Sequence, residues 1–443
     1  LFHKSVTGAK KIVSPCRSFD VLVLNTVRTR TRMHIQGTFF RTFFSATITR
    51  GGIVTNALKK PTTISPTTRS TSTMTMTNKD TATKLNSKPI PHTGLDEIGE
   101  EGSFKRSPSS HTSTIEPGGR FEPEANRYHL YVAHACPWAA GTLAALKYKG
   151  LDGIIGHSVV HPTWAKTNEN DPSDAHCGWH FRNPGDDPVS NILGHGSFEC
   201  DDALVPDTAN GAKTVRELYE LANDTAGKYT TPLLWCKKEK AVVNNESLQI
   251  LKILDESFGD VLRDSGNDNG NDRCLFPPKL QVQAEEWNEL IYDTVNNGVY
   301  KCGFAKTQAA YETAHKELFA TLDVLEAHFG EQNNNSGPPL FLMGTQQPTW
   351  IDIRLYMTLV RFDPVYVVYF KCSHKKIGDS YPNLLTFMRT CYQRVPAIRE
   401  ATNMRHIKMH YYTSHPILNT YGIIPVSNGP SLTEGWEEME EKE

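Results

Sequence analysis

One cysteine stands where a reactive thiolate is easily formed. Cys136 follows a short run of β-branched and aromatic residues (127–132) and precedes a proline and an Ala- and Leu-rich stretch. This pattern predicts a strand that ends before Cys136 and a helix over residues 137–149, with proline in its first turn. The unpaired N–H groups and the dipole of a helix N-terminus favour negative charge. We therefore expect a lowered pKa for the Cys136 thiol and a nucleophile near neutral pH; the alternative is a packed structural thiol.

A Thr-Pro pair and a polar helix start accompany the cysteine. Thr231 and Pro232 precede a predicted strand, which is where thioredoxin-like folds hold a cis-proline and present the preceding backbone to a ligand. We expect this bond to be cis; the alternative is an ordinary edge-strand proline. Glu246 and Ser247 open a predicted helix, where they can hold the ammonium and carboxylate of a ligand or only cap the helix.

The elements that must position these residues follow the order β-α-β, then β-β-α, then helices only. Strands are expected at residues 127–132, 154–160, 232–235 and 241–243, with helices at 137–149, 214–223 and 246–258. Helices alone are expected later, at residues 281–295, 307–329, 351–361 and 383–392. The fold class is therefore a thioredoxin-like α/β domain followed by an all-α bundle.

Two connections differ from simple turns. Residues 162–210 are polar and too long for a simple connection, so we expect a functional loop or lid. Residues 259–272 are rich in Gly, Asn and Asp and are interpreted as a linker. The resulting division is a disordered or targeting segment (1–118), a thioredoxin-like domain (119–262), a linker (263–276), an all-helical domain (277–426) and an acidic tail (427–443).

Composition excludes several classes of function. The formal net charge of −2 gives no reason to expect nucleic acid or an anionic membrane as partner. No run of about 18 apolar residues occurs, so no membrane-spanning helix is expected. The nine cysteines include no C-x-x-C pair, so neither a zinc site nor a dithiol motif is indicated and no metal is expected. Mostly free thiols in a long chain fit a reducing compartment.

The first part of the chain has the composition of a targeting segment. From Met33, the expected start, it reads MHIQGTFFRTFFSATITR, which is basic, free of acidic residues and interleaved with Phe. This is typical of an organelle transit peptide, and the Thr- and Ser-rich stretch at 61–77 is expected to be disordered. We expect a mitochondrial or plastid location, and otherwise a cytoplasmic one; the alternative is an ordinary disordered tail or an untranslated-region artefact.

Taken together, these motifs resemble the glutathionyl-hydroquinone reductases, the Xi class of glutathione transferases. The resemblance covers residues 121–425. Its marks include RYHLYVAHACPWA (127–139), GWHF (178–181), TPLLW (231–235), VNNES (243–247), VNNGVYKCGFA (295–305) and HIKMHYYTSHPILNTYGIIP (406–425). A lone CPW would be weak, whereas the ordered set is specific.

The resemblance implies a reaction, ligands and site residues. The implied reaction is reduction of S-glutathionyl-hydroquinones by glutathione, with Cys136 as nucleophile and no metal. The implied glutathione contacts are Trp179, Arg216, Thr231, Pro232, Glu246 and Ser247. The implied hydroquinone pocket holds Tyr300 and, by spacing, Tyr411 or Tyr412, with Tyr300 and Tyr411 as candidate proton donors. Relatives of this kind are dimers, so a homodimer is expected.

The chain departs from the family pattern near the cysteine. Ala140 and Gly141 stand where His and Arg are usual, Lys228 replaces a common Arg, and Thr231 replaces a common Val. The loss of basic residues after Cys136 is expected to raise its thiol pKa somewhat. A higher thiol pKa would change the rate of the reaction more than its type.

Two other readings remain open at this point. One is an omega-like thiol transferase that acts on dehydroascorbate or protein mixed disulfides, with the same cysteine chemistry and a different electrophile pocket. The other is a non-catalytic, transferase-like binding domain of the kind used in protein assembly. The presence of Cys136 together with Glu246 and Ser247 favours an enzyme.

Overall fold

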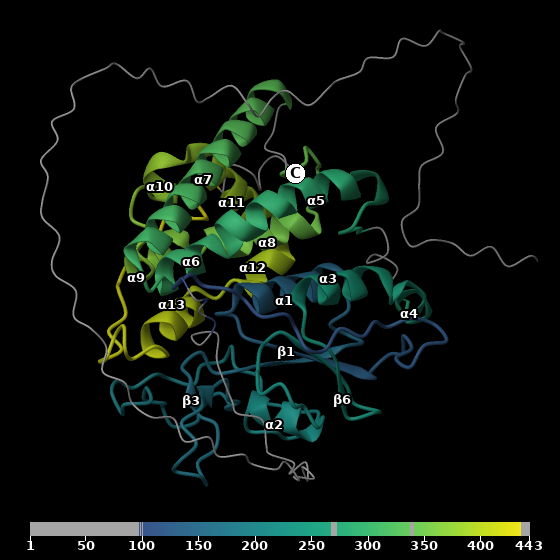
Figure 1. The fold of residues 1–443 in the computed structure, drawn as a ribbon. Helices are drawn as coiled ribbons and strands as arrows, with labels where there is room; N and C mark the ends of the chain where they lie inside the picture. Colours follow the sequence, from purple (N-terminus) through teal and green to yellow (C-terminus); the bar gives the residue numbers. More distant parts are fainter. Residues whose placement is uncertain (1–96, 98, 100, 267–272, 337–340, 436–443) are drawn as a thin grey trace, which may run out of the picture. The chain divides into compact units, whose positions relative to one another are not determined.

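The computed structural model describes residues 97, 99, 101–266, 273–336 and 341–435 (Figure 1). All of these belong to one of two compact units of the chain. The predicted transit segment, the Thr- and Ser-rich stretch and residues 436–443 of the predicted acidic tail lie outside the described residues.

A four-stranded sheet forms the core of the first domain. Its order is β2 (Gly156–Val159), β1 (Tyr128–Val132), β5 (Leu233–Cys236) and β6 (Ala241–Asn244). β1 runs parallel to β2 and antiparallel to β5, and β5 pairs with β6 as a hairpin. β1 is buried along its whole length, because helices cover both faces of the sheet. Its sequence is accordingly mostly aromatic and aliphatic, and its one polar residue, His129, is buried as well.

Three helices flank this sheet. α1 (Pro137–Tyr148) and α3 (Ser247–Glu256) pack against each other, and α2 (Val215–Leu221) contacts β6. Figure 1 draws α1 and α3 above the sheet and α2 below it. This is the β-α-β…β-β-α order predicted from the sequence, and it places the N-terminus of α1 at the end of β1.

The predicted functional loop connects β2 to α2. It contains a two-stranded ladder of β3 (Ala165–Lys166) and β4 (Cys177–Gly178). Asp207 accepts a hydrogen bond from the Tyr131 hydroxyl at 2.8 Å and from three backbone N–H groups of the same loop. The loop is thus tied to the central strand instead of projecting freely.

All regular elements of the second domain are helices, within its described residues. Its elements are η3 (Pro278–Leu280), α5 (Gln281–Ile291), η4 (Tyr292–Asn296), α6 (Gly298–Phe304), α7 (Gln308–Ser336), α8 (Trp350–Leu359), η5 (Phe362–Tyr366), α9 (Val367–Tyr369), α10 (Ile377–Ser380), α11 (Pro382–Arg394), α12 (Pro396–Ala401) and α13 (Met404–Thr413). α1 packs against α8 and α12, so one hydrophobic core continues from the first domain into the second.

A threonine followed three residues later by an acidic residue, as in Thr349 and Asp352, predicts a capping box at the start of α8, and the structure confirms it. Asp352 accepts the Thr349 N–H at 2.8 Å and its hydroxyl at 2.7 Å, and its other oxygen accepts the Leu342 N–H at 2.8 Å. The capping box therefore also fixes the loop that leads into the helix.

Several elements differ from the sequence-based expectation. Part of the expected linker at 259–272 is a short helix, α4 (Gly259–Asp264), held by the buried Leu262. α13 was not expected, because its buried face includes Lys408 and His410 and so lacks an apolar period. The packing of the first domain also begins earlier than residue 119. Phe104 and Ile115 are buried, and Thr112 forms a β-bridge with Asn244.

Candidate functional site

A cavity of about 710 Å³ is lined by residues of both domains. Eight of the ten residues predicted from the sequence line it: Cys136, Trp179, Thr231, Pro232, Glu246, Ser247, Tyr300 and Tyr411. They come from the start of α1, the loop after β2, the start of β5, the start of α3, α6 and α13. Motifs that lie far apart in the sequence therefore meet at one place.

Cys136 is the N-cap residue of α1, as predicted. It is half-buried, and its Sγ lies 3.5 Å from the Thr231 carbonyl oxygen. Burial raises the pKa of the thiol, while the backbone N–H groups of Ala139 and Trp138 and the charge of Arg361 lower it; the net pKa is raised. The predicted lowering is wrong, because desolvation of the sulfur outweighs the helix N-terminus.

Arg361 is a fully buried cation beneath the cysteine turn. Its Nε donates to the Ala135 carbonyl at 3.0 Å, its Nη2 to the His134 carbonyl at 2.7 Å, and its Nη1 to the Met357 carbonyl. No carboxylate lies within ion-pair distance of it in the part of the chain that the structure describes. Its charge therefore remains available to the thiolate. Sequence reasoning missed this residue.

The Thr231–Pro232 peptide bond is cis, which confirms the prediction. The Thr231 carbonyl faces the Cys136 sulfur, and its Oγ1 is buried without a hydrogen-bond partner among the described residues. This backbone edge therefore lines the cavity beside the cysteine, where its polar groups can bind a ligand.

Glu246 and Ser247 lie at the start of α3. The Glu246 carboxylate accepts the N–H of Leu248 at 3.2 Å and that of Gln249 at 2.8 Å, so it caps the helix. Both residues also line the cavity. This geometry confirms that Glu246 caps the helix. That Glu246 and Ser247 also bind the charged groups of a ligand stays a prediction, which their position in the cavity permits.

Trp179 joins the long loop to α13. Its ring stacks on His410 with centroids 4.5 Å apart and stands edge-on to Trp164 at 5.6 Å. Trp164 in turn contacts His415 at 5.3 Å. Burial lowers the pKa of His410 well below its ordinary value and that of His415 to about 4. Both imidazoles are neutral near pH 7, so this wall is aromatic and uncharged.

Three phenols form a hydrogen-bonded chain, and two of them, Tyr300 and Tyr411, line the cavity. The Tyr300 and Tyr411 hydroxyls are 2.7 Å apart, and the Tyr411 and Tyr366 hydroxyls are 3.1 Å apart. Tyr412 instead donates to the Pro364 carbonyl at 2.9 Å and is not among the described residues that line the cavity. The structure therefore selects Tyr411 over Tyr412 as the cavity residue. Tyr366 was missed because nothing in the sequence links it to Tyr411.

The cavity phenols keep their protons near neutral pH. Burial raises the pKa of Tyr300, and the neighbouring Cys136 raises it further. Burial also raises the pKa of Tyr411 well above its ordinary value. A protonated phenol can donate a hydrogen bond or a proton to a group in the cavity.

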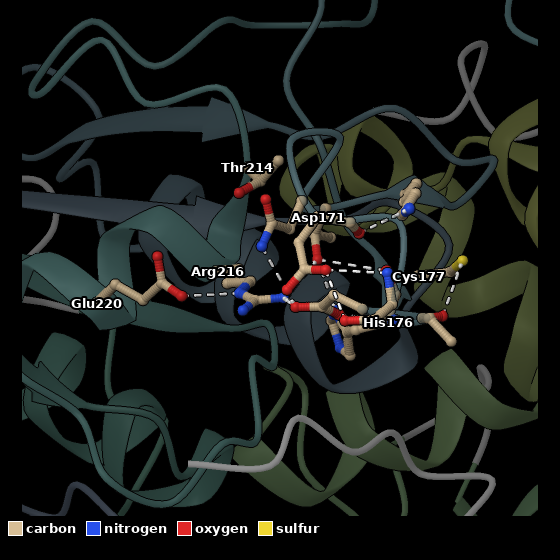
Figure 2. Close-up of polar contacts among 12 residues, drawn as sticks. Asp171, His176, Cys177, Thr214, Arg216 and Glu220 are labelled. Atoms are coloured by element: carbon tan, nitrogen blue, oxygen red, sulfur yellow. Dashed lines mark hydrogen bonds and ion pairs between the residues drawn. The ribbon is translucent and has the colours of Figure 1, made fainter. Parts of the chain in front are cut away.

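Arg216 is engaged elsewhere. Its Nη1 lies 2.6 Å from Asp174 Oδ2 and its Nε 2.8 Å from Glu220 Oε1, and Figure 2 shows Arg216 within this polar group. Arg216 is not among the cavity-lining residues of the described ranges. Asp174 belongs to the long loop that carries Trp179, and Arg216 belongs to α2. Their ion pair therefore fastens this loop to α2. The direct contact of Arg216 with glutathione stays a prediction.

Two further properties concern only the described ranges. Within them, no group of three or more His, Cys, Asp and Glu side chains is placed to hold a metal ion. No helix of the described part combines the length and apolarity needed to cross a bilayer.

Comparison with known proteins links this geometry to a family. The sequence patterns of the glutathione S-transferase N-terminal and C-terminal domains match residues 135–257 and 308–390. The chain is 40% identical over 334 residues to glutathionyl-hydroquinone reductase PcpF of Sphingobium chlorophenolicum, covering 74% of this chain and 90% of that one. It is 37% identical over 338 residues to glutathione S-transferase omega-like 2 of Schizosaccharomyces pombe, covering 75% and 96%.

A solved structure shows the same likeness. The Xi glutathione transferase ECM4 of Saccharomyces cerevisiae in complex with glutathione is 32% identical, with a TM-score of 0.66, and the match covers 75% of this chain and all of that one (100%).

Proposed function

Since the chain belongs to the glutathione S-transferase family, among the Xi-class glutathionyl-hydroquinone reductases, we propose that it reduces S-glutathionyl-hydroquinones to hydroquinones. That it is a glutathione-dependent enzyme of the oxidoreductase and transferase type follows from the family. The finer assignment rests on one arrangement: the Cys136 sulfur and the Tyr300–Tyr411 phenol pair line one cavity.

The proposed reaction has two halves. The Cys136 thiolate attacks the sulfur of the aryl thioether, which forms an S–S bond and breaks the carbon–sulfur bond. The ring reacts in its keto form, in which one ring hydroxyl has given up its proton and Tyr300 or Tyr411 has placed a proton on the carbon that bears sulfur. When the carbon–sulfur bond breaks, its electron pair passes through the ring to that oxygen, which takes up a proton, and the product leaves as the hydroquinone. A second glutathione thiolate then attacks the mixed disulfide, releasing glutathione disulfide and the Cys136 thiolate. The net change converts aryl thioether and glutathione into hydroquinone and glutathione disulfide.

The phenols are predicted to act in the first half. Tyr411→Phe should lower kcat by roughly 10- to 100-fold, because a positioned general acid contributes about 100- to 10,000-fold and Tyr300 remains in place. The KM for glutathione should change little, since the second half needs no proton donor to carbon. Steady-state kinetics with a glutathionyl-hydroquinone measure both parameters.

Tyr412→Phe is the matched comparison, because it removes the neighbouring hydroxyl, which bonds only to the Pro364 carbonyl among described partners. It should keep kcat within about twofold. Equal losses in the two variants would contradict the assignment of Tyr411.

Glu246 is predicted to bind the ammonium of the γ-glutamyl group. A hydrogen bond to a charged group contributes about 1.5–3 kcal/mol, so Glu246→Gln should raise the KM for glutathione roughly 10- to 100-fold with kcat nearly unchanged. Glu256→Gln, an exposed change at the far end of α3, is the control. An unchanged KM in Glu246→Gln would leave this residue with its capping role alone.

A substrate panel tests the proposal against its rivals. Purified protein is assayed with glutathione and either glutathionyl-menadione or dehydroascorbate, and menadiol or ascorbate is measured. Fast menadiol release supports the proposal. Ascorbate production without menadiol identifies the omega-like thiol transferase, and a folded protein that binds glutathione but turns over neither substrate identifies a binding module.

We also propose a homodimer and an organellar location. The homodimer is supported by the family resemblance alone, and size-exclusion chromatography with light scattering measures the oligomeric state.

The organellar location is supported by the basic, Phe-rich composition after Met33. Imaging the full chain with a fluorescent protein at its C-terminus tests it, and a diffuse cytoplasmic signal would contradict it.

A further inference from the structure

A segment that precedes the first domain completes the cavity. The leading segment (residues 101–113) is fixed near one end by Phe104, which is buried against the rings of Tyr300 and Phe304 at 6.2 and 5.8 Å. Near the other end Thr112 forms a β-bridge with Asn244. The leading segment therefore connects α6 of the helical domain with β6 of the sheet, and it passes the cavity between them.

Arg106 is the cation that this segment brings to the cavity. Its guanidinium carbon lies 5.4 Å from the centre of the Trp138 ring and 5.5 Å from that of Tyr300. Its Nε donates to Asn297 Oδ1 at 3.2 Å. Of the described residues, none offers Arg106 a carboxylate within ion-pair distance or a hydrogen-bond acceptor for its two Nη groups. A half-buried guanidinium thus reaches the cavity with most of its donors unused.

The charge of Arg106 acts on two groups of the proposed reaction. It lowers the pKa of the Cys136 thiol and also the pKa of the Tyr300 hydroxyl, each against a larger raising effect of burial. A cation therefore faces both the nucleophile and the phenol chain. Arg361 also lowers the pKa of Cys136, but it lies beneath the cysteine turn and is not among the described cavity-lining residues, whereas Arg106 is.

We propose that Arg106 is an electrostatic residue of the reaction, whose guanidinium stabilises the Cys136 thiolate and the oxygen anion that develops on the departing hydroquinone. This inference rests on the proposed function. When the carbon–sulfur electron pair moves into the ring, negative charge spreads onto the ring oxygen, and a fixed cation beside it lowers the barrier. Arg106 acts through its charge and transfers no proton. The proton on carbon still comes from the phenols.

The test uses the charge-removing variant Arg106→Gln, the charge-keeping variant Arg106→Lys and the control Lys105→Gln. Lys105 is an exposed neighbour on the leading segment, so its change removes one positive charge without touching the cavity. None of the three variants changes another titratable or charged residue near the site, so a difference between them reports the change at residue 105 or 106. The unchanged groups around Cys136 and along the cavity are Glu97, Lys228, Glu246, Tyr300, Arg354, Arg361, His410, Tyr411 and His415.

Two measurements are made. The first follows alkylation of the Cys136 peptide by iodoacetamide against pH, read by mass spectrometry. The second measures kcat/KM for glutathionyl-hydroquinones that release hydroquinones of different acidity. Arg106→Gln should move the alkylation midpoint to higher pH and lower kcat/KM by roughly 10- to 100-fold, most for the least acidic hydroquinone. Arg106→Lys should keep both the alkylation midpoint and kcat/KM close to the wild-type values. Lys105→Gln should match the wild type in both measurements.

An unchanged alkylation midpoint, together with equal losses for every leaving group, would overturn the inference and leave Arg106 as an anchor of the leading segment. Thermal unfolding and glutathione binding of each variant verify that the fold is intact, and Arg106→Lys provides the test if Arg106→Gln does not fold. The alkylation measurement needs no substrate. A midpoint shift in a protein that reduces no conjugate would therefore overturn the proposed function and the leaving-group role, while supporting the thiolate role.

Discussion

Cys136→Ser is expected to lower kcat/KM for glutathionyl-menadione by at least about 1,000-fold. A serine hydroxyl does not ionise near neutral pH and forms no disulfide, so both halves of the proposed reaction stop. The change is nearly isosteric, and Cys136 Sγ makes only a long 3.5 Å contact to the Thr231 carbonyl. Glutathione binding and thermal stability should therefore stay close to those of the wild type. Steady-state kinetics and calorimetric titration with glutathione measure the two effects.

Cys177→Ser is the matched control for this prediction. Cys177 is also a half-buried free thiol, and it is not among the described cavity-lining residues. It should retain full activity. A Cys136→Ser variant that kept most of its turnover would rule out the covalent mechanism.

Arg361→Met is expected to destabilise the fold by about 3–5 kcal/mol. The guanidinium satisfies the carbonyls of His134, Ala135 and Met357, all of them buried near the start of α1. Each buried acceptor left without a donor costs about 1–3 kcal/mol, and methionine fills the space without replacing the bonds. The turn that holds Cys136 should loosen, and its thiol pKa should rise because a lowering charge is lost. Urea unfolding measures the stability.

Arg405→Met serves as the control, because Arg405 is an exposed residue whose ion pairs are with Glu199 and Asp201. Surface pairs of this kind contribute about 0–1 kcal/mol. Equal unfolding midpoints for Arg361→Met and the wild type would show that the buried guanidinium does not hold the cysteine turn.

Much of the first domain could be predicted because local signals agree with the fold. The β1–Cys–Pro–α1 order and the cis bond at Thr231–Pro232 each depend on a few adjacent residues, and so does the capping box before α8 in the second domain. Such features are encoded locally, so pattern and capping rules are sufficient to find them.

The missed features depend on contacts between distant segments. α13 buries Lys408 and His410 against other elements, so its apolar period is hidden. Arg361 and Tyr366 gain their roles from carbonyls and a hydroxyl far away in sequence. The predicted lowering of the Cys136 pKa was wrong for the same reason. Burial of the sulfur depends on residues outside the strand–helix motif, so the motif alone does not reveal the desolvation that raises the pKa.

The choice between Tyr411 and Tyr412 shows the limit of spacing arguments. Adjacent residues of a helix point about 100° apart, so motif alignment alone left both open. The fold decides, because Tyr411 meets Tyr300 in the cavity and Tyr412 bonds to the Pro364 carbonyl.

The most direct test of the central claim is a single turnover without free glutathione. Wild-type protein in excess is mixed with glutathionyl-menadione and quenched in acid, and menadiol and every cysteine peptide are quantified by mass spectrometry. The proposed mechanism predicts one menadiol for each glutathionyl-menadione added and an equal amount of glutathione bound to Cys136 as a mixed disulfide. Glutathione added afterwards should remove this bound glutathione as glutathione disulfide. Menadiol release without glutathione on Cys136, or with it on another cysteine, would contradict the mechanism.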